Sequence, residues 1–226
     1  ISTADADGDI VKNIITWYNN VSTYQNLYLP MEGGTSNSTY TKDYTNFSIN
    51  ASVNGGAVWN STGGYDGRGA YRCDGTSGYL QSDLSGSGWN NLTVMFWAKP
   101  INSPTSVGIF QWANSLSSGT PYILLQRDTS TSARWFASND YRLTNLTINN
   151  NNWYHFAITF NGSAWSFYTN GSLSGFYTGG PGASGSGSLY YCNGYDGYFA
   201  GMIDDAQVYK KSLSPEQIGA IYANRT

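Results

Sequence analysis

The stretch NNWYHFAITFNGSAWSFYTNGSLSG, residues 151–175, decides the fold class of this 226-residue chain. Within residues 153–160, every second side chain belongs to one apolar face: Tyr154, Phe156, Ile158 and Phe160. A period of two residues predicts a β-strand whose apolar face points toward a core. The Asn-Gly pairs at 161–162 and 170–171 supply the positive φ angles that tight hairpin turns need. We therefore expect a run of antiparallel strands joined by short turns.

Similar β-branched and aromatic runs, separated by Gly, Asn, Ser and Pro, extend this pattern along most of the chain. They are VMFWAKP (94–100), VGIFQWA (107–113), YILLQRD (122–128), ARWFAS (133–138) and SLYYCNG (188–194). The C-terminal SPEQIGAIYANRT differs, because Ser214 as N-cap, Pro215 and a capping-box Gln217 predict a helix. We expect an all-β fold, a two-sheet antiparallel jelly-roll β-sandwich with one short C-terminal helix that closes an edge.

The first part of the chain has a different character, with spaced acidic residues followed by an alternating apolar run. We therefore divide the chain into an N-terminal strand-containing extension, residues 1–28, and a jelly-roll domain, residues 29–226. About 28 residues are too few for an immunoglobulin-like domain. The extension therefore packs on the jelly roll, is mobile, or adds a strand to the sheet of another chain.

The composition is typical of extracellular β-proteins. Charged residues make up 11% of the chain and aromatic residues 16%, whereas about a quarter of an average protein is charged. The formal net charge is −3 and there is no basic run, so nucleic acid is not an expected partner. No apolar stretch approaches the roughly 18 residues of a transmembrane helix, so we expect no membrane span.

Ten N-x-S/T motifs are candidate sites of N-glycosylation. They are Asn20, Asn37, Asn46, Asn50, Asn60, Asn91, Asn145, Asn161, Asn170 and Asn224. A composition rich in Asn, Ser and Thr creates such motifs by chance, but roughly half this number is expected on that basis. Glycosylation of several of them implies a secretory or cell-surface setting. In that oxidising setting we expect Cys73 and Cys192, the two cysteines, to form a disulfide.

Two adjacent carboxylates, Asp204 and Asp205, interrupt an otherwise apolar strand pattern at residues 198–209. Strict alternation places Asp204 on the same face as Ala206 and Val208, toward the core, and turns Asp205 outward. Neighbours that face opposite ways cannot act on one bond, so the two acids are not a catalytic pair. A buried carboxylate needs a cation or several N–H donors, and both remain open for Asp204.

Four ordered blocks of this sequence carry a resemblance to a known family. They are GGYDGRGAYRCDGTSGYLQ (63–81), LTVMFWAKP (92–100), NNWYHFAITFNGSAWSFYTNGSLSG (151–175) and YFAGMIDDAQVYKKSLSPEQIGAIY (198–222). Together they resemble a laminin-G-like domain of the concanavalin A-like lectin/glucanase type, over about residues 29–224. The family usually has Phe where this chain has Cys73, which fits a strand position recruited for a disulfide.

The resemblance implies a jelly roll that commonly holds one structural calcium. In the wider fold, the ion uses an acid of the last strand and oxygens of an early turn and the first strand. The corresponding positions here are Asp204, Asp74 or Gly75, and Glu32. Calcium prefers such oxygen ligands, so it is an expected cofactor, with hydrogen bonds from loop amides to Asp204 as the alternative.

The family contains lectins, polysaccharide-degrading enzymes and adhesive modules, so the fold does not decide the function. Glycoside hydrolysis needs a pair of carboxylates, and the glucanase branches carry Glu-x-Asp-x-Glu on one strand. This chain has two glutamates, Glu32 at a turn and Glu216 in the helix cap. Its single histidine, His155, matches a structural W-x-H element of the family. We expect no enzymatic activity.

Saccharide sites combine aromatic rings with Asn and Asp hydrogen-bonding groups. The candidate contacts are Tyr195, Asp196 and Tyr198 of the loop GYDGY, together with Trp112. We expect an extracellular, N-glycosylated adhesion or glycan-recognition module of a cell-surface protein, whose partner is a glycan or a surface protein. The alternative is a subunit of an extracellular filament or surface layer, in which residues 1–28 add a strand to the next copy.

Overall fold

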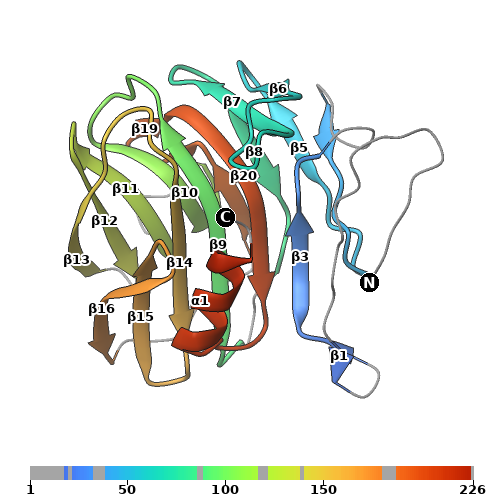
Figure 1. Ribbon diagram of the computed structural model, residues 1–226, viewed down its shortest axis with the longest axis vertical. Coiled ribbons are helices and arrows are strands. Elements are labelled where there is room, and N and C mark those ends of the chain that lie inside the picture. Colours follow the sequence, from blue (N-terminus) through green and yellow to red (C-terminus); the bar gives the residue numbers. More distant parts are fainter. Residues whose placement is uncertain are drawn as a thin grey trace.

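The computed structural model describes residues 18–19, 22–32, 39–85, 89–116, 122–137, 140–179 and 187–224. Over these residues, two large antiparallel sheets pack face to face and one short helix follows the last strand (Figure 1). The predicted fold class is therefore confirmed.

The first sheet has ten strands. Its order is β13 (Asp140–Thr147), β12 (Ser132–Ala137), β11 (Ile123–Thr129), β10 (Val107–Ala113), β17 (Ser188–Tyr191), β8 (Tyr79–Ser82), β5 (Ala51–Asn54) and β4 (Tyr40–Thr41). The short hairpin of β18 (Asn193–Gly194) and β19 (Gly197–Tyr198) joins this sheet at β10.

The second sheet has eight strands. Its order is β16 (Ser172–Thr178), β15 (Ala164–Thr169), β14 (Tyr154–Phe160), β9 (Leu92–Pro100), β20 (Ala200–Tyr209), β7 (Ala70–Asp74) and β6 (Val58–Asn60), and β3 (Gln25–Leu29) pairs with β20. A separate two-stranded hairpin consists of β1 (Tyr18–Asn19) and β2 (Ser22–Thr23).

The stretch 151–175 forms three consecutive antiparallel strands, β14, β15 and β16, as its pattern predicts. The apolar face of β14 lies in the core between the sheets. Asn170 and Gly171 both have positive φ, at 50° and 74°, as the tight turn requires. At the other turn Gly162 alone has positive φ, and Asn161 instead accepts hydrogen bonds from the next residues, so this loop is longer than predicted.

Helix α1 (Pro215–Ala223) begins with the predicted capping box between Ser214 and Gln217. Ile218 and Leu213 pack on a cluster of second-sheet side chains that points away from the core: Met95, Ala157, Tyr168 and Tyr209. The helix therefore covers the outer face of the second sheet, where Figure 1 shows it in front of β9 and β14, rather than closing an edge. No helix among the described residues is long and apolar enough to cross a membrane.

A disulfide joins Cys73 of β7 to Cys192, which follows β17, with an S–S distance of 2.12 Å. The two half-cystines come from different sheets and are both buried. The predicted pair is therefore confirmed, and it ties the two layers of the sandwich together across a sequence separation of 119 residues.

Strand β20 does not alternate regularly. Its pairing with β9 shifts after Asp204, and Asp205 has a φ of 53°, as the extra residue of a bulge does. The bulge resets the alternation, so Ile203 and Ala206 both lie in the core and Asp204 pairs with Trp97 on the outer face. The expectation of an inward Asp204 and an exposed Asp205 is therefore wrong, and Asp205 is buried.

Strand β3 is a buried part of the second sheet, paired antiparallel with β20. The backbone N–H of Tyr28 also donates a hydrogen bond to the buried carboxylate of Asp43, at 2.9 Å. The proposed boundary between residues 28 and 29 therefore falls inside a strand of the jelly roll (Figure 1). Residues 1–17, 20 and 21 lie outside the described part, and strand exchange through residues 1–28 stays a prediction.

Candidate functional site

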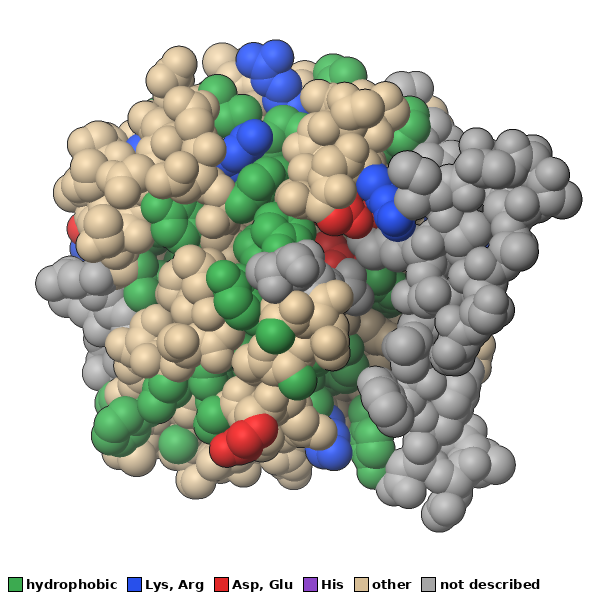
Figure 2. All heavy atoms as spheres, in the orientation of Figure 1, with side chains coloured by type: hydrophobic (Ala, Val, Ile, Leu, Met, Phe, Trp, Pro, Cys, Tyr) green, Lys and Arg blue, Asp and Glu red, His purple; other side chains and the backbone are tan. Residues whose placement is uncertain are grey.

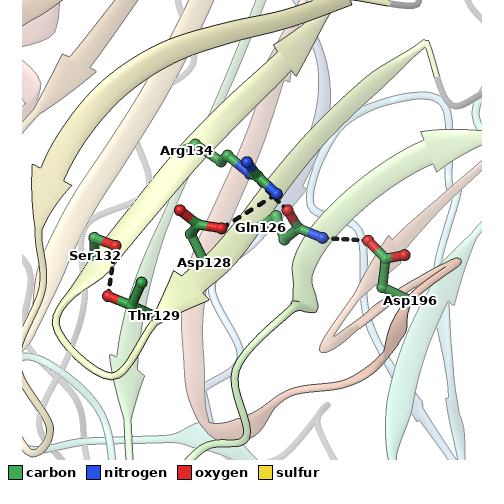
Figure 3. Close-up of polar contacts among 6 residues, drawn as sticks. All are labelled: Gln126, Asp128, Thr129, Ser132, Arg134 and Asp196. Atoms are coloured by element: carbon green, nitrogen blue, oxygen red, sulfur yellow. Dashed lines mark hydrogen bonds and ion pairs between the residues drawn. The ribbon is translucent and has the colours of Figure 1, made fainter.

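The outer face of the first sheet carries a connected set of polar side chains. Ile123 and Leu125 of β11 belong to the core, so Gln126 and Asp128, as well as Arg134 of β12, are directed away from it. Arg134 Nε donates to Gln126 Oε1 at 2.8 Å, and Gln126 Nε2 donates to Asp196 (Figure 3). Gln126 is 3% exposed, so this buried amide holds a guanidinium at one end and a carboxylate at the other.

A salt bridge completes this polar set. Arg134 Nη2 lies 3.2 Å from Asp128 Oδ1, and both side chains are partly exposed (Figure 3). The guanidinium of Arg134 is therefore engaged by Gln126 and by Asp128, from the same neighbouring strand. Planar groups fixed in this way present their remaining hydrogen-bonding edges to solvent in a defined orientation.

The hairpin formed by residues 193–198, here called the 193–198 hairpin, folds across this face because two glycines meet there. A Cβ on Gly108 would lie 2.4 Å from Gly194 Cα, so no larger residue fits without displacing the backbone. The backbone N–H of Tyr195 then donates to Gln111 Oε1 at 3.0 Å. These contacts place Asp196, at the tip, within hydrogen-bonding reach of Gln126 on β11.

Three tyrosines extend the face from the hairpin to β8 and β17. The ring of Tyr79 lies 6.3 Å, between centroids, from the rings of both Tyr190 and Tyr198. Next to them Asp83 accepts hydrogen bonds from Ser188 and Gln81, and these bonds lower the pKa of its carboxyl. The face therefore combines the partly exposed Tyr79 and Tyr198, packed on the buried Tyr190, with oriented amide, guanidinium and carboxylate groups.

Asp196 titrates unusually. Although Asp196 is exposed at the tip of the hairpin, partial burial raises the pKa of its carboxyl above the ordinary 3.8, and the hydrogen bonds from Tyr195 and Gln126 and the nearby charge of Arg134 offset only part of this. The carboxylate is consequently an acceptor whose protonation begins at a higher pH than that of an ordinary aspartate.

Of the four residues predicted to contact a saccharide, three lie on this face and one does not. Tyr195, Asp196 and Tyr198 lie together on this face, as the loop GYDGY suggested. Trp112 does not, because its ring is fully buried in the core, edge-on to Trp89 at 5.8 Å, where no saccharide reaches it. The prediction for Trp112 is therefore wrong.

The sequence reasoning missed Gln126, Asp128 and Arg134. The signal for them was present, because the alternation of YILLQRD puts Gln126 and Asp128 opposite the apolar Ile123 and Leu125. What the sequence did not contain was the pairing of β11 with β12, which sets Arg134 opposite Gln126.

The proposed calcium ligands are divided between two places. Asp204 Oδ2 accepts a hydrogen bond from the Tyr65 N–H at 3.0 Å, and Glu32 Oε2 accepts one from Gly69 at 3.2 Å, so both anchor the loop before β7. Asp74 instead pairs in register with Ala200, four residues and roughly 13 Å along β20 from Asp204.

The side chain of Asp74 is committed to its own turn. Its carboxylate accepts five hydrogen bonds, from the backbone amides of Thr76, Ser77 and Gly78 and from the hydroxyls of Thr76 and Ser77. A Cβ on Gly75 would contact Ala200. The four residues are therefore not one ligand set, and no group of three His, Cys, Asp or Glu among the described residues forms a metal site. Calcium binding stays a prediction without a defined site.

Most of the N-glycosylation motifs lie at the surface of the described chain. Asn46, Asn50, Asn60, Asn91, Asn161 and Asn224 are exposed and Asn170 is partly exposed, whereas Asn20, Asn37 and the side chain of Asn145 lie outside the described part. None of the ten motifs falls in β8, β10, β11, β12, β17 or the 193–198 hairpin. Glycosylation at these motifs therefore leaves the strands of the polar and aromatic face unmodified.

A family model described as the concanavalin A-like lectin/glucanases superfamily, Laminin_G_3, matches residues 74–219. The chain belongs to this superfamily. No curated protein sequence matches it.

Solved structures share the fold. Domain 4 of AbnA, a GH43 extracellular arabinanase from Geobacillus stearothermophilus in complex with arabinotriose, aligns with a TM-score of 0.70 and 20% identity, over 88% of this chain and 98% of its own. The receptor binding domain of botulinum neurotoxin C/D mosaic serotype aligns with a TM-score of 0.69 and 17% identity, over 89% of this chain and 51% of its own.

The binding domain of Paraclostridial Mosquitocidal Protein 1 also aligns with a TM-score of 0.69, at 16% identity, over 89% of this chain and 52% of its own. This superfamily member therefore spans about half the length of the two toxin domains, and almost the whole of the arabinanase domain. At these identities the likeness establishes the fold alone.

Proposed function

We propose that this chain is a non-catalytic saccharide-recognition module of a secreted or cell-surface protein, and that the saccharide binds on the outer face of the first sheet around the 193–198 hairpin. The observation that carries the proposal is the set Arg134–Gln126–Asp196, fixed by hydrogen bonds and bordered by tyrosines. Saccharides present hydroxyl groups at ring edges and apolar C–H faces, and sites for such ligands combine oriented polar groups with aromatic surfaces.

The roles of the individual residues follow from their exposure. Arg134, Asp128 and the exposed Asp196 offer donors and acceptors to sugar hydroxyls, and the partly exposed rings of Tyr195 and Tyr198 offer apolar surface. Gln126 is buried and is a positioning residue that holds Arg134 and Asp196 in place.

Two further observations support this assignment. The strands that carry the named residues of the face contain none of the N-glycosylation motifs, so no attached glycan originates from them. In addition, the AbnA domain that matches this chain in size and fold was solved in complex with arabinotriose. The disulfide and the glycosylation motifs support an extracellular location.

The test is a binding screen of the chain against a broad panel of neutral and acidic oligosaccharides, followed by isothermal titration of the best binders. Asp196→Ala removes a charged acceptor, whose loss costs about 1.5–3 kcal/mol, so we expect binding to weaken by about tenfold or more. Phe176→Ser, an exposed position on β16 of the other sheet, is the control and should bind as the original chain does. Absence of binding across the panel, or equal binding by Asp196→Ala, contradicts the proposal.

A further inference from the structure

The charges on the proposed face are unbalanced, and this imbalance bears on which saccharides it accepts. Among the described side chains, three carboxylates belong to the face, Asp83, Asp128 and Asp196, and Arg134 is their one cation. The other described cations lie elsewhere. Arg68 and Arg72 lie before or in β7, Lys99 lies in β9, Lys210 and Lys211 follow β20, and Arg127 is buried. Lys42 follows β4, at the end of the first sheet far from β12, and lies over the ring of Tyr44.

The one cation is already engaged. Its Nε donates to Gln126 and its Nη2 lies 3.2 Å from Asp128, so an acidic sugar that approached its remaining N–H groups would also approach the carboxylate of Asp128. A carboxylate or sulfate group on the saccharide would also approach Asp196, which is exposed at the tip of the hairpin. Like charges brought together at an interface cost several kcal/mol, whereas neutral hydroxyls donate hydrogen bonds to these carboxylates.

We propose that this face selects neutral saccharides and rejects those that carry a carboxylate or sulfate group, with Asp128 and Asp196 as the residues that determine the selectivity. Asp196 repels an anion directly, and Asp128 does so by offsetting the positive charge of Arg134 beside it. This inference rests on the proposed function, because it names the ligand class of the same face.

The test uses matched pairs of oligosaccharides that differ by one acidic group, such as lactose and sialyllactose, or a neutral hexose trimer and its uronic acid counterpart. For the intact chain we expect each neutral member that binds to bind at least about tenfold more tightly than its acidic counterpart. The double variant Asp128→Asn/Asp196→Asn removes the two carboxylate charges beside Arg134. The ratio of the affinity for the neutral member to that for the acidic member should therefore fall by about tenfold or more.

Asp66→Asn is the control for removal of a carboxylate away from the face, because Asp66 is exposed on the loop that leads into β7 of the other sheet. It should leave the ratio unchanged. Two results overturn this inference: equal or tighter binding of the acidic members by the intact chain, and an unchanged affinity ratio in the double variant. Both leave the proposal of saccharide recognition intact. Absence of binding to every member of the pairs instead contradicts the proposed function itself.

Discussion

At the scale of single residues, this chain uses its few carboxylates as fixed acceptors. Asp74 closes a turn, Asp43 joins β3 to the following loop, and Asp204 holds the backbone of Tyr65. Tyr65 then lies flat on Trp97, with ring centroids 3.5 Å apart, so Asp204 positions an aromatic cover over the outer face. Asp204 therefore has an architectural role, and the bulge at Asp205 is what places it on this outer face.

Asp74 yields a prediction about stability and pH. Its partial burial raises its pKa, but hydrogen bonds from Ser77, Thr76 and Gly78 outweigh this, so the folded-state pKa is well below 3.8. A lowered folded-state pKa contributes stability above the unfolded value and loses it as the pH falls. We expect Asp74→Ala to lower the free energy of unfolding by about 1–2 kcal/mol at neutral pH, measured by urea denaturation.

The difference between Asp74→Ala and the original chain should shrink as the pH falls below 3.8. Asp66→Ala is the control, because Asp66 is exposed and accepts a hydrogen bond from the backbone N–H of Arg68 in its own loop, at 3.0 Å. A loss of stability that is equal for the two variants, or that does not depend on pH, would show that the turn does not depend on the Asp74 carboxylate.

Asp196 yields a prediction about binding. Because burial raises the pKa of its carboxyl, Asp196 gains a proton at a pH where ordinary aspartates are still ionised. Protonation removes acceptor capacity, so the affinity for a neutral oligosaccharide should fall as the pH is lowered from neutral toward 3.8. Titrations of the original chain and of Asp196→Asn over this range check it, and the variant should show a flat profile. A parallel decline in both would assign the effect to another group.

At the scale of the elements, the close approach of the 193–198 hairpin to β10 builds the site. Gly108 and Gly194 allow this approach, and Gln111 and Gln126 hold the hairpin from below. On the opposite side of the molecule, α1 and the loop before β7 cover the second sheet, and Figure 2 shows apolar side chains across that face with charged side chains scattered among them.

Gly108→Ala tests the contact between hairpin and sheet. The added Cβ would lie 2.4 Å from the Gly194 backbone, so the hairpin must shift, at a cost of about 1–3 kcal/mol, and saccharide affinity should fall. Gly219→Ala is the matched control on α1, where the added Cβ meets Gly171 O at an ordinary 3.7 Å. Alanine is the better helix former, so thermal unfolding should show this control stabilised by about 0.5–1 kcal/mol. Unchanged affinity in Gly108→Ala would mean that the hairpin does not form the site.

Local patterns predicted most of the elements but not their exact alternation or partners. The apolar face of β14 and the capping box of α1 follow from residues close together in sequence, and both are confirmed. The orientation of Asp204 was predicted from Ala206 and Val208, which follow the bulge at Asp205. One inserted residue shifts every later side chain to the other face, so Asp204 and Ala206 do not share a face. The site residues on β11 and β12 were not predicted, because they are brought to the hairpin by strand pairing, which depends on residues far apart in the sequence.

At the scale of the whole molecule, the disulfide is the covalent link between the two sheets. It joins β7 to the end of β17, the strand that leads into the 193–198 hairpin, and so connects the layers directly beside the site. The chain is thereby held as one sandwich, with a covered outer face on the second sheet and a polar, aromatic outer face on the first.

Removal of this disulfide has a predictable cost. A native disulfide that closes a long loop typically contributes about 2–4 kcal/mol, largely by restricting the unfolded chain. Cys73→Ala/Cys192→Ala should therefore lower the free energy of unfolding by about this amount, as measured by urea denaturation without reductant. Reductant should destabilise the original chain in the same way and leave the double variant unaffected. Equal stability of the two proteins in the absence of reductant would contradict this account.

The central claim is that the outer face of the first sheet around the 193–198 hairpin binds saccharides. The most direct measurement is nuclear magnetic resonance titration of the labelled 24.6 kDa chain with a neutral oligosaccharide selected in the binding screen. We predict that the largest chemical-shift changes occur at Tyr195, Asp196, Tyr198 and the side chain of Arg134, with little change at Trp97 and Tyr222 on the opposite face. Saturable shifts confined to the opposite face, with none at the hairpin, would contradict the claim.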